Sequence, residues 1–319
     1  MNNLTEKMQA LLEAQIYQWE QCRQGYASLK EAEFKEYNCN TYNVIAQFNP
    51  SRIISSTAKV DSKSIRRRKC FLCKHNLPSQ QQGIETVNGF VILCNPAPIF
   101  SSHFTISHID HIPQSILEHF ESILIISKEL GPEITVIYNG PQSGASAPDH
   151  LHFQAFTSGI MPVESAVKEN GRVESIRQGL GVIRMYDRTI LVLQGDSSSM
   201  LCKDFANIYS RFAEVVGTGW NGEPLLNLIV RYEENRWLVL VFLRKRHRPD
   251  HYFKQGKEQL IISPGAVDMG GLLIAPRRED FDRLTVELIK DIYMQVSLEE
   301  EVFYTIIDGL RLLKKDCFG

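Results

Sequence analysis

The sequence predicts an α+β protein with antiparallel sheets flanked by helices, and three observations support this fold class. First, residues 89–156 read in the order strand, strand, helix, strand, loop, strand. Second, a similar order returns after Gly159, which indicates a degenerate internal duplication. Third, the chain opens with helical spacing before either unit begins. We therefore expect an N-terminal helical segment at 1–40, a first domain at 41–160 and a second, degenerate domain at 161–319.

The first two parts can be justified element by element. Apolar residues three and four positions apart, from Leu4 to Trp19, predict one or two helices within residues 4–36 that pack on the outside of the body. The period changes at Thr41, where TYNVIAQFNP predicts a strand that stops at Asn49 and Pro50. The remaining elements of the first domain are expected at 89–95, 103–107, 115–130 (helical), 133–139 and 150–156.

The second domain repeats this pattern with other residues. RTILVLQ, PLLNLIVRY and RWLVLVFLRKRH predict strands, and residues 202–216 predict a helix between the first two. The string ISPGAVDMGGLLIAPR predicts a loop and a strand, and two helices are expected near 279–295 and 298–313. The strand WLVLVFLRKRH occupies the place that HLHFQAF has in the first domain.

Composition excludes several classes of protein. The 319 residues hold 35 basic and 37 acidic side chains, a net charge of −2, which gives no general attraction to nucleic acid or to an anionic membrane. No window approaches the roughly 18 apolar residues of a membrane helix, and the polar N-terminus does not resemble a secretory signal. Seven cysteines do not make a disulfide framework. We expect a cytoplasmic protein, and the apolar face of the N-terminal helices is available to the body or to a partner in a homodimer.

The run His150–Gln154 is the strongest candidate for a functional site. Strand alternation places His150, His152 and Gln154 on one face, with the apolar residues between them on the other. A lone histidine of this kind is usually a hydrogen-bonded core residue, whereas three polar groups aimed from one strand indicate a site. The preceding loop, with Ser143, Gly144 and Ser146, has the small residues that let backbone N–H groups and hydroxyls approach a phosphate.

Cys70 and Cys73 have the two-residue gap with which two thiolates bind one Zn²⁺. Histidines that could complete such a site stand at positions 103, 108, 111 and 150. Two alternatives remain open: a reduced pair without a metal, and a redox motif, which would require a helix starting inside the CxxC of a different pattern. Cys22, Cys39, Cys94, Cys202 and Cys317 are interpreted as ordinary thiols.

Two basic clusters allow a structural and a functional interpretation. The run Arg66–Lys69 is either a solvated loop or lies near a bound phosphate, because it adjoins the cysteine pair. Arg244 and Arg248 end an apolar strand, where they form either a solvated turn or a bidentate phosphate clamp. Asp268 and the glycines of SPGAVDMGG could shape the same pocket.

CFLC, followed by NGFVILCNPAPIF and then by NG…SGASAPDHLHFQ, resembles the transferase branch of the histidine-triad (HIT-like) superfamily. The string is similar to signatures of galactose-1-phosphate uridylyltransferase, of ATP adenylyltransferases (the diadenosine tetraphosphate phosphorylases) and of GDP-L-galactose and GDP-D-glucose phosphorylases, of which the last are the most similar at His150–Ala155. The resemblance covers about residues 46–280 and implies tandem HIT-like domains, of which the first is catalytic.

The resemblance also implies roles for individual residues. His152 would attack the α-phosphorus of a nucleotide and become nucleotidylated, and Gln154 would bind a non-bridging oxygen of that phosphate. Ser146 and its loop would hold phosphate charge, next to the family's Asn139-Gly140 pair. His150 would belong both to the catalytic motif and to a structural zinc site; the ligands implied are Cys70, Cys73, His150 and His111, with His108 as the alternative to His111.

One residue departs from the pattern, because Asp149 separates Pro148 from His150 where the uridylyl- and adenylyltransferases have no residue. We expect a nucleotidyltransferase or phosphorylase acting on a sugar nucleotide, GDP-hexose first, with phosphate or a sugar phosphate as acceptor. The alternatives are a dinucleoside polyphosphate phosphorylase and a catalytically silent nucleotide-binding protein.

Overall fold

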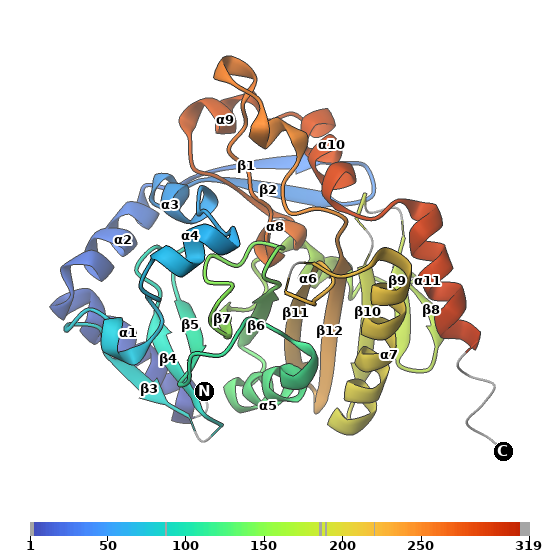
Figure 1. Cartoon of the computed structure of the whole chain (residues 1–319), viewed down its shortest axis with the longest axis horizontal. Helices are drawn as coiled ribbons and strands as arrows, with labels where there is room; N and C mark the ends of the chain where they lie inside the picture. Colours follow the sequence, from blue (N-terminus) through green and yellow to red (C-terminus); the bar gives the residue numbers. More distant parts are fainter. Residues whose placement is uncertain (1–2, 87, 185–186, 189, 220, 313–319) are drawn as a thin grey trace.

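A single ten-stranded antiparallel sheet runs through the molecule in the computed structural model, which describes residues 3–86, 88–184, 187–188, 190–219 and 221–312 (Figure 1). Every neighbouring pair of its strands is antiparallel. In spatial order the strands are β3 (Gly83–Glu85), β4 (Phe90–Cys94), β5 (His103–His108), β7 (His152–Thr157), β6 (Ile134–Asn139), β11 (Leu226–Glu233), β12 (Arg236–Leu243), β10 (Ile190–Gly195), β9 (Leu180–Ile183) and β8 (Val173–Arg177).

The two halves of this sheet have the same element order, which confirms the predicted tandem fold. In each half three strands are followed by a helix and two more strands: α5 (Phe120–Leu130) lies between β5 and β6, and α7 (Ser198–Val216) lies between β10 and β11. The halves join where β6 pairs with β11, with Asn139 opposite Asn227. Strand β12 therefore corresponds to β7, as expected, whereas β8 and β9 were not anticipated from the sequence.

Each face of the sheet packs against its own hydrophobic core. One core joins α1 (Asn3–Gln18), α5, α7 and α11 (Glu300–Leu312) to the sheet, and the Phe120 and Phe205 rings stack there with centroids 3.9 Å apart. The other core holds residues of α6 (Pro162–Ala166), α8 (Ala266–Met269), α9 (Arg278–Arg283) and α10 (Val286–Val296). Phe153 and Ala155 of β7 face the first core, so the polar residues that alternate with them face the other side.

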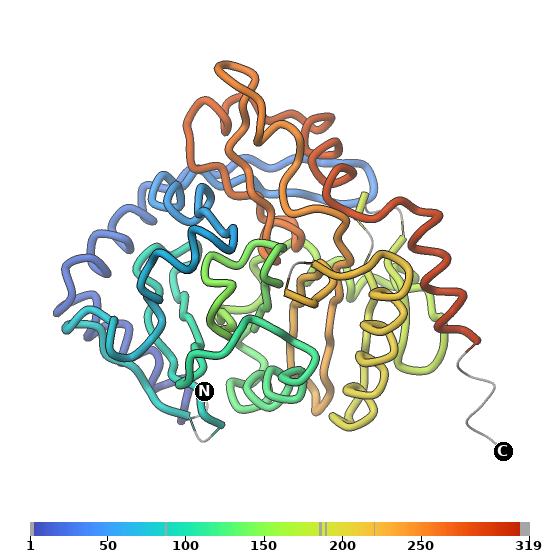
Figure 2. The backbone as a smooth tube through the Cα atoms, in the orientation of Figure 1, coloured from blue at the N-terminus to red at the C-terminus, as the bar shows by residue number. Residues whose placement is uncertain are grey.

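A second, three-stranded sheet lies across the second core and corrects one expectation. The N-terminal helices end at Lys30, after α1 and α2 (Glu20–Lys30), and residues 33–38 form strand β1 (Glu33–Asn38), not the end of a helix. Strand β1 pairs with β2 (Asn43–Phe48), and β2 pairs in parallel with β13 (Leu272–Ala275), so distant parts of the chain lie side by side (Figure 2). This pairing accounts for the strand, and the predicted stop of β2 before Asn49 is confirmed.

The apolar face of α1 packs on the body, because Met8 and Leu12 are buried in the first core. Residues 53–56 form α3 (Ile53–Ser56). Of the basic run Arg66–Lys69, for which a solvated loop was one interpretation, the first two residues end α4 (Ser62–Arg67), which the Asp61 side chain caps. Within the described residues no helix has the length and apolar character needed to cross a bilayer. Short 3₁₀ turns occur at Pro50–Arg52, Lys74–Asn76, Leu117–His119, Asp250–Phe253 and Gly256–Glu258.

Candidate active site

His152 opens strand β7 and has the geometry of a neutral nucleophile. Its Nδ1 lies 2.8 Å from the carbonyl oxygen of His150, and because a carbonyl only accepts, Nδ1 carries the proton and Nε2 keeps its lone pair. Burial lowers the pKa of His152 to about 4, which keeps the ring neutral at pH 7. The side chain lines a cavity of about 640 Å³. An imidazole with one nitrogen fixed and the other free beside a cavity can attack an electrophile there.

Gln114 holds the backbone of His152, and sequence reasoning missed it. The His152 N–H donates to Gln114 Oε1 (2.8 Å), and Gln114 Nε2 donates to the carbonyls of His152 (3.0 Å) and Asn139 (2.9 Å). The fully buried amide thus bridges β6 and β7 beyond the end of their ladder. Glu223 from the second half supports this loop by accepting from the Ile116 N–H and the Tyr138 hydroxyl, each at 2.7 Å.

Gln154 is oriented by His103, a histidine that the sequence offered only as a metal ligand. His103 Nδ1 accepts the Ile99 N–H at 3.1 Å, so Nε2 carries the proton and donates to Gln154 Oε1 at 2.9 Å. Burial lowers the pKa of His103 to about 3 and keeps it in this neutral form. Because the amide oxygen is occupied, the Gln154 NH₂ group is the part available to an anion in the pocket.

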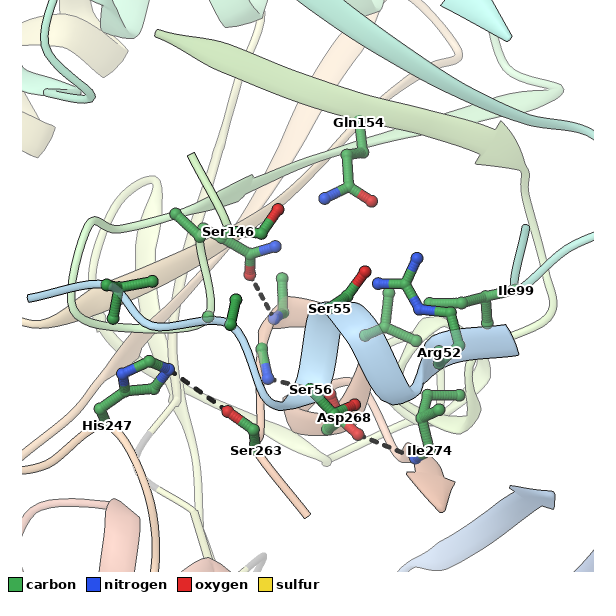
Figure 3. A pocket seen from close by; sticks show the side chains of 18 of the residues that line it. Arg52, Ser55, Ser56, Ile99, Ser146, Gln154, His247, Ser263, Asp268 and Ile274 are labelled. Atoms are coloured by element: carbon green, nitrogen blue, oxygen red, sulfur yellow. Dashed lines mark hydrogen bonds between the residues drawn. The ribbon is translucent and has the colours of Figure 1, made fainter. Parts of the chain in front are cut away.

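Arg52, Ser55, Ser146 and Gln154 point toward one shared space in Figure 3. Arg52 comes from the turn before α3 and donates to the Ala97 carbonyl at 2.8 Å. Burial lowers the pKa of this guanidinium to about 10, so it remains cationic at pH 7. A cation, an amide and two hydroxyls around one space can bind phosphate oxygens. Arg52 carries no motif, and nothing in the sequence singled it out.

The other predicted phosphate-loop residues have different surroundings. Gly144 lines the same narrow pocket with φ of +105°, and a Cβ there would lie 2.7 Å from the Gly265 Cα, so only glycine fits. Asn139 also lines it, with its Oδ1 accepting from the Ala266 N–H at 2.7 Å. Ser143 is fully buried, and Gly140 N–H donates to the Leu226 carbonyl at 3.1 Å, so these two lie at the junction of the halves.

Arg244 and Arg248 play different parts. Arg244 is fully buried, and all five of its N–H groups have protein acceptors: Asn227 Oδ1 and the carbonyls of Val296, Pro264, Arg246 and His247. It therefore has no donor left for a substrate phosphate in this conformation. Its hydrogen bonds instead hold segments of the second half together. Arg248 lines the narrow pocket and is half-buried, with its Nε donating to Ser263 Oγ at 2.9 Å.

Cys70, Cys73, His111 and His150 converge, with one ligand atom of each within 4.8 Å of all the others. His150 Nδ1 lies 3.3 Å from Cys70 Sγ, and His111 Nδ1 lies 3.2 Å from Cys73 Sγ. His150 Nε2 donates to the His108 carbonyl at 2.8 Å, which leaves Nδ1 as an acceptor facing the thiols. Two sulfurs and two imidazole nitrogens in this arrangement fit a four-coordinate metal ion. His108 itself is turned away, with its Nδ1 accepting the Asp110 N–H.

Asp149, the residue that departs from the family pattern, lies beside this cluster. Its carboxylate forms an ion pair with Arg68, and its Oδ2 lies 4.0 Å from His111 Nε2. Of the basic run, Arg68 lines the large cavity, with its guanidinium 5.1 Å from the centroid of the Phe71 ring, and Arg66, Arg67 and Lys69 are exposed. Cys22, Cys39, Cys94 and Cys202 are free thiols, and Cys317 lies outside the described residues.

The fold is shared with solved enzymes of low sequence identity. The yeast Ap4A phosphorylase Apa2 in complex with Ap4A is 15% identical, covers 93% of this chain and 98% of its own, and superposes with a TM-score of 0.65. Another structure of the yeast enzyme gives 15% identity, 88% and 96% coverage and a TM-score of 0.60. An ADP-glucose phosphorylase from Arabidopsis thaliana also matches, at 14% identity, 84% and 100% coverage and a TM-score of 0.34. No curated protein matches by sequence.

The fold of this chain is therefore the one that the yeast Ap4A phosphorylase has. Residues 162–312 match a family model described as "GDPGP1-like, C-terminal domain". Residues 11–157 match a family described as "Domain of unknown function (DUF4922)".

Proposed function

We propose that this chain is a nucleotidyltransferase of the phosphorylase type, which transfers a nucleotidyl group from a nucleoside diphosphate hexose, GDP-hexose first, to phosphate by way of His152. The observation that carries the proposal is the fixed tautomer of His152, whose Nδ1–H donates to the His150 carbonyl while Nε2 stays free beside the cavity. The family assignment of the C-terminal domain and the histidine-strand motif support the same class of reaction.

The proposed reaction consists of two displacements at the α-phosphorus. In the first, the Nε2 lone pair of His152 forms a P–N bond, and the bond from the α-phosphorus to the bridging oxygen breaks, with its electron pair leaving on hexose 1-phosphate. In the second, an oxygen of inorganic phosphate attacks the same phosphorus, the P–N bond breaks, and the nucleoside diphosphate and neutral His152 are released. The imidazole thus serves first as nucleophile and then as leaving group, which splits one difficult transfer into two easier displacements.

The groups around the pocket would stabilise the charge that moves during each displacement. The Gln154 NH₂ group would donate to a non-bridging oxygen, with its orientation held by His103. Arg52 and Ser146 would neutralise and bind the phosphates between the nucleoside and the hexose. His150 would act through its backbone carbonyl, which keeps the proton on His152 Nδ1.

The proposed cofactor is structural zinc, held by Cys70, Cys73, His111 and His150, a ligand set that the convergence of the four side chains supports. A four-coordinate site of this kind has no open position for water and supplies rigidity instead of acid–base chemistry. The metal would fix the side chain of His150. Because the carbonyl that accepts from His152 Nδ1 belongs to the same residue, its position would be fixed as well.

Dinucleoside polyphosphate phosphorolysis is the second candidate. The solved relative with the TM-score of 0.65 is an Ap4A phosphorylase with Ap4A bound, and the 640 Å³ cavity has apolar walls that suit any nucleobase. The same two displacements would then expel a nucleoside polyphosphate in place of hexose 1-phosphate.

Incubation with α-³²P-labelled nucleotide sugars and dinucleotides tests the proposal. We expect acid-labile, base-stable label on the wild type and none on His152→Ala. The matched control is His108→Asn, in which the amide oxygen can still accept the Asp110 N–H, and it should keep the label. Nucleotide binding without label on the wild type, across the whole panel, would refute the covalent mechanism and favour a silent nucleotide-binding protein.

A further inference from the structure

We propose that the substrate cavity has two unlike ends, and that the end formed around Lys59, Arg248 and Tyr252 is a subsite for the hexose phosphate and not for a second nucleoside. The inference rests on the proposed function and goes further, because it selects between the two substrate classes left open above. It also assigns a binding role to α4 and to the segment that precedes it.

The three pockets of this region adjoin one another and share lining residues. The large cavity beside His152 shares Arg52, Ser146 and Gln154 with the narrow pocket of Figure 3, which has a volume of about 50 Å³. The narrow pocket shares His247 and Arg248 with a third pocket of about 640 Å³. In the proposed binding mode, a ligand with its α-phosphorus at His152 and its phosphates at Arg52 would extend past Arg248 into the third pocket.

The segment that separates the two ends is fixed from the second half. Arg248 Nη2 donates to the carbonyls of Ser56 (3.2 Å) and Ala58 (3.0 Å), and the Tyr252 hydroxyl donates to the Ser56 carbonyl at 3.2 Å. Ala58 lines all three pockets. The segment after α3 is thus a bridge over the narrow part of the cavity, and the two ends differ in the residues on either side of it.

The large cavity has the surfaces that a nucleobase needs. Trp19, Ile54, Phe71 and Leu72 line it, and Ile54 and Phe71 are 80% and 48% exposed, so this end presents apolar surface to a ligand. The aromatic ring of Phe71 offers a face for stacking. This end therefore suits the nucleoside.

The third pocket has the opposite character. Its lining includes Lys59, Asp61, Gln142 and Arg248, which offer charges and hydrogen bonds. Its rings are that of Tyr252, which the Arg248 guanidinium covers at 4.2 Å from the centroid, and the imidazole of His247, whose Nε2 lies 3.4 Å from Ser263 Oγ. The hydroxyls and the phosphate of a hexose phosphate would find partners among these charged and hydrogen-bonding groups.

Arg248 is placed to bind that phosphate. Its Nε and Nη2 are held by Ser263 Oγ and by the two bridge carbonyls, and in the described part of the chain Nη1 has no hydrogen-bond partner. Lys59 forms no ion pair with any described residue and lines both large pockets. The leaving hexose phosphate and the incoming inorganic phosphate would use the same two cations in turn.

Helix α4 offers a matched set of variants. Ser62 lines the third pocket, Ser64 lines the nucleoside end, and Lys63 between them is exposed and lines neither. Calorimetry on the full chain would measure the affinities of GMP, GDP-glucose and glucose 1-phosphate for Ser62→Trp, Ser64→Trp and Lys63→Trp. If another nucleoside monophosphate binds more tightly than GMP, the same series is run with that base.

We expect Ser62→Trp to weaken GDP-glucose and glucose 1-phosphate at least tenfold while the affinity for GMP changes less than twofold. Ser64→Trp should weaken GMP and GDP-glucose equally, and Lys63→Trp should change nothing. Diguanosine tetraphosphate should bind the wild type no more tightly than GTP. Equal effects of Ser62→Trp on GMP and GDP-glucose would overturn the inference, as would tenfold tighter binding of diguanosine tetraphosphate that Ser62→Trp abolishes.

These outcomes are separable from those of the proposed function. Label on His152 with no pocket-specific effect of Ser62→Trp would refute the hexose phosphate subsite alone. No binding of any nucleoside monophosphate would refute both.

Discussion

Replacing Gln114 by methionine tests how the catalytic strand is held. The substitution keeps the volume of the side chain and removes its polar atoms, so three buried backbone groups lose their partner: the N–H and C=O of His152 and the C=O of Asn139. An unsatisfied buried polar group costs about 1–3 kcal/mol. Relaxation of the loop that carries Gln114 offsets part of the sum, and we expect a loss of about 3–5 kcal/mol in the free energy of unfolding.

Two measurements check this prediction. Urea unfolding gives the change in free energy, and the rate at which His152 takes up label reports the position of the nucleophile at a temperature where both proteins are folded. We expect the labelling rate of Gln114→Met to fall at least tenfold, with nucleotide affinity changed less. A loss of stability under 1 kcal/mol together with a normal labelling rate would show that the clamp does not position His152.

Three further predictions concern other parts of the site. Burial raises the pKa of Glu223 to about 7, so its contribution to stability is complete below about pH 4.5 and is lost as the pH rises through 7. We expect Glu223→Gln to remove up to about 3 kcal/mol of the pH dependence of the free energy of unfolding. A free energy of unfolding of the wild type that does not change between pH 5 and 8 would contradict this. His103→Phe keeps an aromatic ring but frees the Gln154 amide, and we expect the labelling rate to fall about fivefold to tenfold with unchanged Kd for the nucleotide; an unchanged rate would exclude orientation by His103. Metal analysis should find about one zinc per chain and little in Cys70→Ser, with Cys202→Ser as the control that keeps it; less than a tenth of an equivalent in the wild type would exclude the site.

The parts of the site that lie close together in the sequence could be predicted. Strand alternation over residues 150–154 and the CxxC spacing need only local geometry, and the structure brings Cys70, Cys73 and His150 together with a fourth group. The choice of His111 over His108 came from spacing within a family pattern, and the structure favours it because His108 turns back to its own loop. The periodicity of the two halves likewise predicted most strands, but not the short β8 and β9.

The residues that hold the site through long-range contacts could not be predicted. Gln114 and Arg52 stand in loops without a motif, and their roles appear only when β6, β7 and the turn after β2 are brought together. Arg244 shows the opposite case, in which a charged side chain that looks functional in the sequence has a structural role. A basic run at the end of an apolar strand looks like a phosphate clamp, yet folding buries this guanidinium among five protein acceptors.

The divergence of the two halves follows from the shared sheet. In β7 the face that carries His152 and Gln154 is polar, whereas the matching face of β12 carries Leu238, Leu240 and Phe242 in the second core. Because β6 and β11 pair at the centre, the second half lies against the first half's site and can contribute to it without a nucleophile of its own. It supplies Glu223, Asn227, Arg244 and Arg248, which support the catalytic loop, join Asn139 and fix the bridge over the cavity.

The second half lacks the histidine motif, but substitutions in it would still disturb the site. A change at Asn227 would leave the carboxamide oxygen of Asn139, the carbonyl of Ser143 and the guanidinium of Arg244 each short of a partner inside the protein. The lost hydrogen bonds would disturb the pocket of the first half, because Asn139 and Gly144 line that pocket. In the proposed reaction, the first half would supply the reacting groups of the site, and the second half would hold them in position.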